Sequence, residues 1–190
     1  ETAVELEPDR LERVRVRLRD RDWREVTTEE LAQAVGLSRM TLHRRGIDKD
    51  VLLAQLGRLL EGEYRDAILP ALVSSAPAPE RLRLALSALC AVNERYLGLL
   101  DALGRASAFV FHEEGDGPVN TRVDFTDALR RILRDGSAEG TLRAEDPLQL
   151  ATLLFNATGW TYRHMRAGHR WPPARVREQL VALLLEGVML

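Results

Sequence analysis

The sequence has one cysteine, one lysine and no long apolar run. The single cysteine, Cys90, excludes an intramolecular disulfide and fits a reducing compartment. No apolar stretch approaches the roughly 20 residues that span a bilayer, and no basic start leading into an apolar run marks a signal peptide. We therefore expect a soluble, cytoplasmic protein that has no membrane partner.

Motifs of catalysis and metal binding are also scarce. The sequence has no nucleophile elbow, no phosphate-binding loop and no dinucleotide-binding glycine motif. The segment His112–Asp116 offers metal-capable side chains, but no second histidine follows at the helical spacing that the zinc-protease pattern requires. His164 and His169 are better interpreted as surface or core residues. We expect a protein that is not an enzyme, with no cofactor and no metal.

Helical patterns account for most of the chain, and no strand alternation of useful length interrupts them. Hydrophobic residues make up 45% and charged residues 29% of the 190 positions, which is ordinary for a globular domain. Apolar spacing, caps and breakers therefore predict an all-α fold. A first helix begins at Pro8, and later ones cover 49 to about 70, 80–103, a short segment at 105–113, 119–134 (ended by Asp135–Gly136), 147–167 and 174–190.

The most informative stretch is residues 27–49, TTEELAQAVGLSRMTLHRRGIDK. The threonines at its start can cap a first helix, and Gly36 follows the last apolar residue of that helix, where glycine adopts a left-handed conformation without steric cost. Ser38 can cap a second, short helix. Small Ala32, turning Gly36 and apolar Leu42 have the spacing of a helix-turn-helix.

The second helix of this stretch is the candidate DNA-reading element. Because Leu42 points toward the first helix, the neighbouring side chains face solvent or a partner. Residues 38–49 carry four basic residues and one acidic residue, a net charge of +3 on a chain whose total charge is −2. A local positive patch on an acidic protein favours phosphate binding. A solvated basic helix in an ordinary bundle is the alternative interpretation.

Two stretches resemble one known family. Residues 27–53, TTEELAQAVGLSRMTLHRRGIDKDVLL, resemble the N-terminal DNA-binding segment of the TetR family of transcriptional regulators, and GTLRAEDPLQLATLLFNATGW resembles that family's ligand-binding and dimerisation domain. The resemblance implies an all-α fold, with a three-helix DNA-binding unit at residues 1–48 and an effector-binding and dimerisation domain at residues 49–190. It also implies three partners: a double-stranded DNA operator, a small-molecule effector and a second copy of the chain.

The resemblance extends to single positions in the DNA-binding segment. Two features depart from the family pattern: His43 stands where tyrosine is usual, and Gly46–Ile47 replaces an aromatic residue followed by a small one. The missing aromatic residue is expected to weaken packing at the end of the recognition helix. The positions that match DNA contacts, or are expected to face DNA, are Thr28, Arg39, Met40, Thr41, His43, Arg44, Arg45 and Lys49.

The last two predicted helices carry apolar residues on more than one face. Such a helix must bury both faces, one in its own domain and one elsewhere, which favours a symmetric four-helix dimer interface over two central core helices. The effector pocket is expected between the middle helices and the first interface helix, although core packing is the alternative for each candidate. Because few charges fall among them, an apolar or weakly polar ligand is expected. The candidates are Leu89, Val92, Tyr96, Phe109, Phe111, Phe125, Phe155, Asn156 and Trp160.

The sequence thus predicts a dimeric, ligand-responsive transcriptional regulator, most simply a repressor that a small apolar molecule releases from a palindromic operator. The rival hypothesis is a helical small-molecule carrier or protein-interaction module whose DNA-binding-like head is unused. Salt-dependent binding to duplex DNA distinguishes the two.

Overall fold

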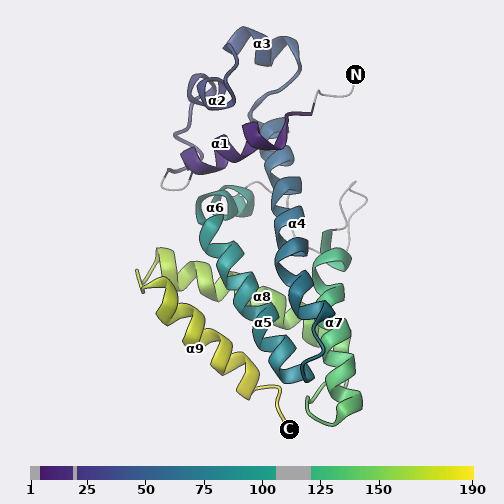
Figure 1. Ribbon diagram of the computed structural model, residues 1–190. Helices are drawn as coiled ribbons and strands as arrows, with labels where there is room; N and C mark the ends of the chain where they lie inside the picture. Colours follow the sequence, from purple (N-terminus) through teal and green to yellow (C-terminus); the bar gives the residue numbers. More distant parts are fainter. Residues whose placement is uncertain (1–4, 19–20, 106–120) are drawn as a thin grey trace. The chain divides into compact units, whose positions relative to one another are not determined.

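The structure, a computed structural model, describes residues 5–18, 21–105 and 121–190. In these residues it is all-α, as predicted, with an isolated bridge between Leu142 and Met189 as the one β-type pairing (Figure 1). The helices are α1 (Pro8–Leu18), α2 (Thr28–Val35), α3 (Arg39–Arg44), α4 (Lys49–Val73), α5 (Ala78–Arg95), α6 (Leu97–Arg105), α7 (Thr121–Glu139), α8 (Pro147–Ala167) and α9 (Pro173–Glu186).

The chain forms two compact units. The first comprises Glu1–Gly62 and Arg95–Val110, and the second comprises Glu63–Glu94 and Phe111–Leu190. Helices α1, α2, α3 and α6 belong to the first unit, and α7, α8 and α9 belong to the second together with nearly all of α5. The long helix α4 contributes to both.

The core of the first unit forms where the apolar stripes of its short helices meet. Leu11 and Val14 of α1 are buried together with Leu31 and Val35 of α2, and α1 packs against both α2 and α6. Leu42 of α3 is 2% exposed, which confirms that it plugs the helix-turn-helix from inside. The three-helix head is therefore a packed unit.

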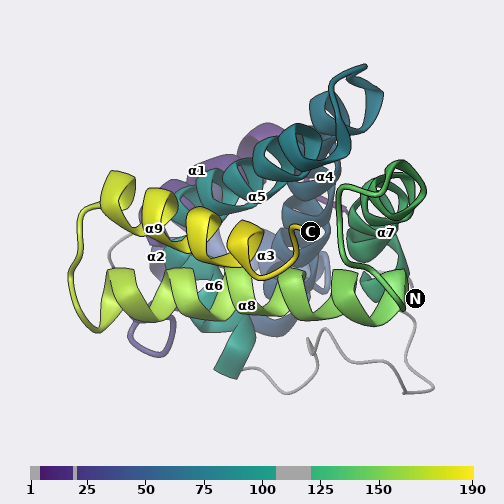
Figure 2. The same ribbon diagram turned by 90° about the horizontal axis from the view of Figure 1, so that it is seen from below.

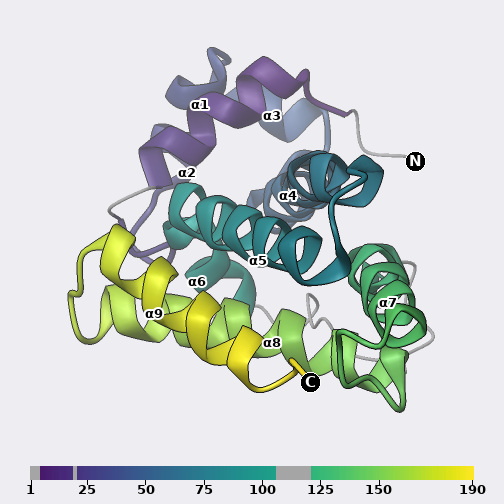
Figure 3. The same ribbon diagram turned by 60° about the horizontal axis from the view of Figure 1, so that its bottom comes forward.

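The second unit is a bundle in which α8 packs against α7 and α9. Figures 2 and 3 show α9 lying beside α8, with α7 next to the first turns of α8. Leu86 of α5, Ile132 of α7 and Leu154 of α8 are among its buried side chains. Asp146 caps α8 by accepting hydrogen bonds from the N–H groups of the first turn, and Pro147 opens the helix, as predicted.

One predicted helix, 80–103, is wrong: it divides into α5 and α6 at Tyr96. A contact that is distant in sequence lies at the break. In the first unit, Arg15 of α1 donates to the Arg95 carbonyl at 2.8 Å, and its guanidinium lies 5.2 Å from the centre of the Tyr96 ring. The apolar pattern of the segment does not encode this partner, so it predicts a continuous helix.

Two predicted helix ends are also wrong. α7 passes through Asp135–Gly136 and ends at Glu139, before Gly140 with its φ of +68°. Gly136 serves packing, since a Cβ there would lie 2.6 Å from Cγ of buried Leu142. The last helix stops at Glu186, after which the chain turns toward the bridge with Leu142. The short helix predicted at 105–113 lies outside the described residues, except for Arg105.

Candidate nucleic-acid interface and effector pocket

The corner of the helix-turn-helix is built by local hydrogen bonds. Thr27, the first of the two candidate threonines, caps α2: its hydroxyl accepts from the Glu30 N–H at 3.2 Å, and the Glu30 carboxylate accepts from the Thr27 N–H at 2.8 Å. The hydrogen bonds that the Thr27 N–H and the Thr27 hydroxyl donate to the Glu30 carboxylate lower the pKa of Glu30. At the other end, Gly36 has a φ of +69° and its N–H reaches the last carbonyls of α2. The predicted turn at Gly36 is confirmed.

Helix α3, the predicted recognition helix, is held at both ends. The Ser38 hydroxyl accepts from the Thr41 N–H at 3.1 Å, which confirms the predicted cap. After α3, Gly46 takes a φ of +64°, and the Ile47 N–H donates to the Leu42 carbonyl at 3.0 Å. Ile47 is only 2% exposed, so it fills the space that the sequence analysis expected to be loosely packed. The expected weakness at this end of the helix is not present.

The side chains that α3 leaves outside form a basic surface with an apolar tip. Met40 is 81% exposed, and Arg39, His43, Arg44 and Arg45 are exposed as well. The guanidinium groups of these three arginines make no hydrogen bond or ion pair with any residue that the structure describes, so their charges are available to a partner.

Two other predicted DNA contacts flank this surface. Thr41 is half-buried, and its hydroxyl lies 2.8 Å from that of Ser38, within the cap of α3. Thr28 is exposed as the first residue of α2.

Lys49 makes internal contacts that the sequence did not predict. Its ammonium group donates to the carbonyls of Trp23 and Val26, the latter at 2.8 Å, and lies 4.8 Å from the centre of the Trp23 ring. The first residue of α4 thereby holds the segment that leads from α1 into α2. Any phosphate contact that Lys49 makes must therefore coexist with this internal clamp.

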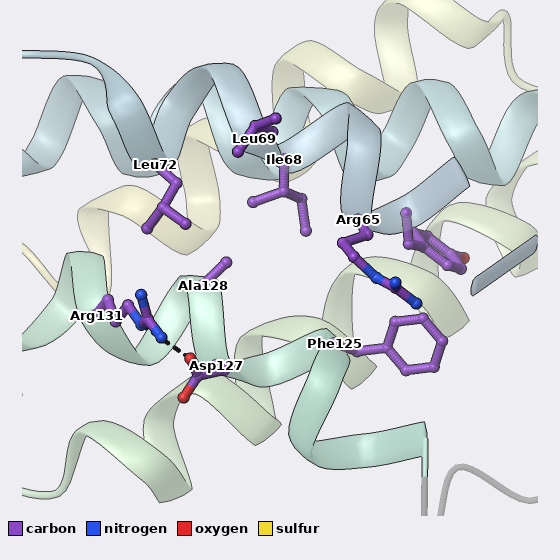
Figure 4. Close-up of a pocket in the computed structure, with 9 residues that line it drawn as sticks. Arg65, Ile68, Leu69, Leu72, Phe125, Asp127, Ala128 and Arg131 are labelled. Atoms are coloured by element: carbon purple, nitrogen blue, oxygen red, sulfur yellow. Dashed lines mark ion pairs between the residues drawn. The ribbon is translucent and has the colours of Figure 1, made fainter. Parts of the chain in front are cut away.

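A pocket of about 430 Å³ opens between α4 and α7 in the second unit (Figure 4). The lining residue Tyr64 is buried: its hydroxyl donates to Asn93 Oδ1 at 2.8 Å, and its ring lies 5.3 Å from that of Phe125. Phe155 stacks on Phe125 at 5.4 Å. The lining residues are Tyr64, Arg65, Ile68, Leu69, Leu72, Phe125, Asp127, Ala128 and Arg131.

The predicted pocket residues do not lie together at one site. Phe125 lines this pocket and Phe155 supports it. Trp160 lies at the surface, 60% exposed, with the Arg163 guanidinium 4.8 Å from its ring. Tyr96 belongs to the first unit. Of the remaining candidates, Leu89 and Val92 are buried on α5, half-buried Asn156 donates to a carbonyl of its own helix, and Phe109 and Phe111 lie outside the described residues.

The pocket residues missed by the sequence analysis come mainly from α4. Arg65, Ile68, Leu69 and Leu72 recur at helical spacing and share one face. That spacing was available in the sequence, but it is identical to the signature of a buried core stripe. The lining also contains Arg65 and Arg131, so it carries more charge than the predicted candidates do.

Helices α8 and α9 both expose apolar side chains on the side away from their own core. Leu153 and Trp160 on α8 are 66% and 60% exposed, and Leu183 on α9 is 66% exposed. On the opposite face of α8, Leu154 and Phe155 are buried. The two-faced pattern predicted for α8 is thus present in the structure.

The described part of the chain shows neither a cluster of metal-capable side chains nor a membrane-spanning helix. No group of three or more metal-capable side chains gathers there, and the His112–Asp116 segment lies outside it. His164 and His169 lie together near the end of α8, with ring centres 5.1 Å apart. No helix among the described residues combines the length and apolarity needed to cross a membrane.

Comparisons with known proteins agree on one family. Residues 75–188 match the family described as tetracyclin repressor-like, C-terminal domain. The nucleoid occlusion factor SlmA of Vibrio vulnificus is 29% identical over 162 residues, which cover 84% of this chain and 83% of that protein.

Solved structures show the same fold. A TetR/AcrR-family transcriptional regulator from Thermobifida fusca has a TM-score of 0.70 at 21% identity, covering 95% of this chain and 97% of that one. AibR in complex with isovaleryl coenzyme A and operator DNA has a TM-score of 0.69 at 18% identity, covering 93% and 96%.

Proposed function

This chain belongs to the TetR family of transcriptional regulators, and from this premise we propose that it is a dimeric repressor that a small molecule releases from a palindromic operator. The observation that carries the proposal is the surface of α3. A helix fixed by Ser38 and the Gly36 corner presents Arg39 and Arg44 with no partner in the described residues. Exposed guanidinium groups on such a helix suit both phosphates and guanine edges.

The DNA contacts divide by position. Arg39, Met40, Thr41 and either Arg44 or Arg45 are assigned to base edges in the major groove, where a recognition helix reads sequence. His43 and Lys49 are assigned to phosphates. Thr28 at the start of α2 is also assigned to a DNA phosphate, because the N–H groups of a helix N-terminus attract anions.

The second copy of the chain is proposed to pack on α8 and α9. Exposed Leu153, Trp160 and Leu183 supply the apolar area that such an interface buries. Functionally, residues 1–48 are assigned to DNA binding, and residues 49–190 to effector binding and dimerisation. The pocket between α4 and α7 is the proposed effector site, and an effector would act by shifting the population of conformers that bind the operator.

Selection of bound fragments from random duplex DNA tests the function. We expect a palindrome whose half-sites lie about 34–36 Å apart or a multiple of that distance, with affinity that falls steeply as salt rises. Equal affinity for every duplex sequence would refute the repressor hypothesis. Absence of any duplex binding would favour the carrier with an unused head.

A second candidate function comes from the Vibrio vulnificus relative, which is named as a nucleoid occlusion factor and matches both units of this chain. Chromatin immunoprecipitation separates the two. A repressor of a few genes occupies a few sites upstream of them, whereas a factor acting on the nucleoid occupies many sites spread along the chromosome.

A further inference from the structure

The pocket between α4 and α7 has a divided lining. Six of its residues are apolar or aromatic, and the apolar part continues to its mouth, where Leu69 is 51% exposed. The other three lining residues, Arg65, Asp127 and Arg131, carry charge. A ligand that matches this lining needs an apolar body and a polar group.

The two arginines occupy different ends of the pocket. In Figure 4, Arg65 extends from α4 toward Phe125, while Arg131 and Asp127 lie together on α7 nearer to Leu72. This separation means that a single small headgroup contacts one end while the apolar body lies along the other lining residues.

The charge that remains available in the lining is positive. The Asp127 carboxylate pairs with Arg131 at 2.8 Å and also with Arg130, so it is already neutralised. The guanidinium group of Arg65 makes no hydrogen bond or ion pair with any residue that the structure describes. An uncompensated guanidinium beside an apolar surface favours a carboxylate, which it can bind through two parallel hydrogen bonds.

We infer that this pocket binds an amphipathic monoanion, a carboxylate with an aliphatic or aromatic body, and that Arg65 recognises the carboxylate. The inference rests on the proposed function, since it names the chemical class of the effector. A cationic ligand is disfavoured because the lining carboxylate is shared by two arginines. A ligand with several negative charges is disfavoured because only one lining arginine lacks a partner in the described residues.

The test is calorimetric titration of the full-length protein with octanoate and with 1-octanol, which share the same alkyl chain, and with acetate, which has only the headgroup. An exposed ion pair contributes up to about 1 kcal/mol, or about fivefold in affinity. We therefore expect octanoate to bind about fivefold more tightly than octanol, acetate to show no binding, and the preference to shrink at high salt.

Three variants locate the effect. Arg65→Gln should weaken octanoate about fivefold and leave octanol unchanged. Arg83→Gln, which removes an exposed arginine of α5 in the same unit, should change neither. Ala128→Trp should fill the pocket and abolish binding of both ligands.

The inference is overturned if octanol binds as well as octanoate, if neither binds, or if Arg65→Gln leaves the preference intact. Duplex binding by the same preparations is measured separately. If the protein binds its operator but shows no preference for octanoate, only the inferred ligand class is refuted. If it binds no duplex DNA, the proposed function is refuted.

Discussion

Replacing Lys49 with methionine separates the two roles of this residue, because methionine keeps the apolar stem and removes the ammonium. The ammonium donates to the carbonyls of Trp23 and Val26 and lies over the Trp23 ring. A hydrogen bond to a charged group contributes about 1.5–3 kcal/mol, and a cation–π contact at a partly exposed site about 0.5–1 kcal/mol. The two hydrogen bonds and the cation–π contact sum to about 3.5–7 kcal/mol. Because Lys49 is only half-buried, water replaces part of what is lost, and we expect Lys49→Met to lower the free energy of unfolding by about 2–4 kcal/mol.

The same substitution should act on DNA binding through charge. Each neutralised phosphate contributes about 0.9 to the slope of log affinity against log salt concentration. If Lys49 contacts one phosphate in each half of a dimer, Lys49→Met should flatten that slope by about 1.8 and weaken all duplex sequences alike. Urea unfolding followed by circular dichroism measures the first effect, and gel-shift titrations at several salt concentrations measure the second.

Arg45→Gln is the matched control. It removes a positive charge from the same surface, but Arg45 has no partner among the described residues, so unfolding should change by less than about 0.5 kcal/mol. If Lys49→Met unfolds like the wild type, the carbonyl clamp does not stabilise the head. If the salt slope stays unchanged, Lys49 contacts no phosphate, and the assignment made from the family resemblance is wrong.

Three further predictions concern the corner, the interface and the packing of α7. Gly36→Val should reduce stability and operator binding together, because a β-branched residue fits a φ of +69° poorly; normal melting and binding would show that the turn tolerates a side chain. Leu153→Glu should yield monomers in analytical ultracentrifugation, while Val73→Glu, at a similarly exposed apolar site on α4, should leave the assembly unchanged. If Leu153→Glu sediments as a dimer, as Val73→Glu should, the interface lies elsewhere. Gly136→Ala should destabilise the protein in urea although alanine is the better helix former by about 1 kcal/mol, because overpacking against Leu142 costs about 1–3 kcal/mol; a gain in stability would mean that Leu142 moves aside easily.

Features set by neighbouring residues were predictable from the sequence. The caps at Ser38 and Asp146 and the turn at Gly36 each depend on hydrogen bonds that close within a few residues, so residue type and spacing determine them. The inward position of Leu42 follows from the same local geometry. These are the features on which the placement of α3 depends, and the structure contains all of them.

Features set by distant partners were not predictable. The break at Tyr96 lies where Arg15 of α1 contacts the chain, and the glycine at position 136 leaves room for the side chain of Leu142. Pocket and core also present the same apolar spacing, so the sequence could not show that Leu69 is half-exposed while Leu89 is fully buried. Phe125 could therefore be predicted as a pocket residue, whereas Arg65 could not, because its significance depends on the α7 residues across the pocket.

Each of the three tryptophans lies beside a cation. The Lys49 ammonium is 4.8 Å from the ring centre of Trp23, and the guanidinium groups of Arg163 and Arg175 are 4.8 and 4.0 Å from those of Trp160 and Trp171. Indole emission responds to a nearby charge, so each tryptophan is an optical reporter of its own surroundings.

These surroundings differ: Trp23 is buried in the N-terminal head, Trp160 lies on the exposed face of α8, and Trp171 lies just before α9. Variants that keep a single tryptophan and replace the other two with phenylalanine would give separate signals for operator binding and for association of two chains. None of the three lines the pocket between α4 and α7. An effector that enters this pocket would therefore change their emission only by moving the protein around them.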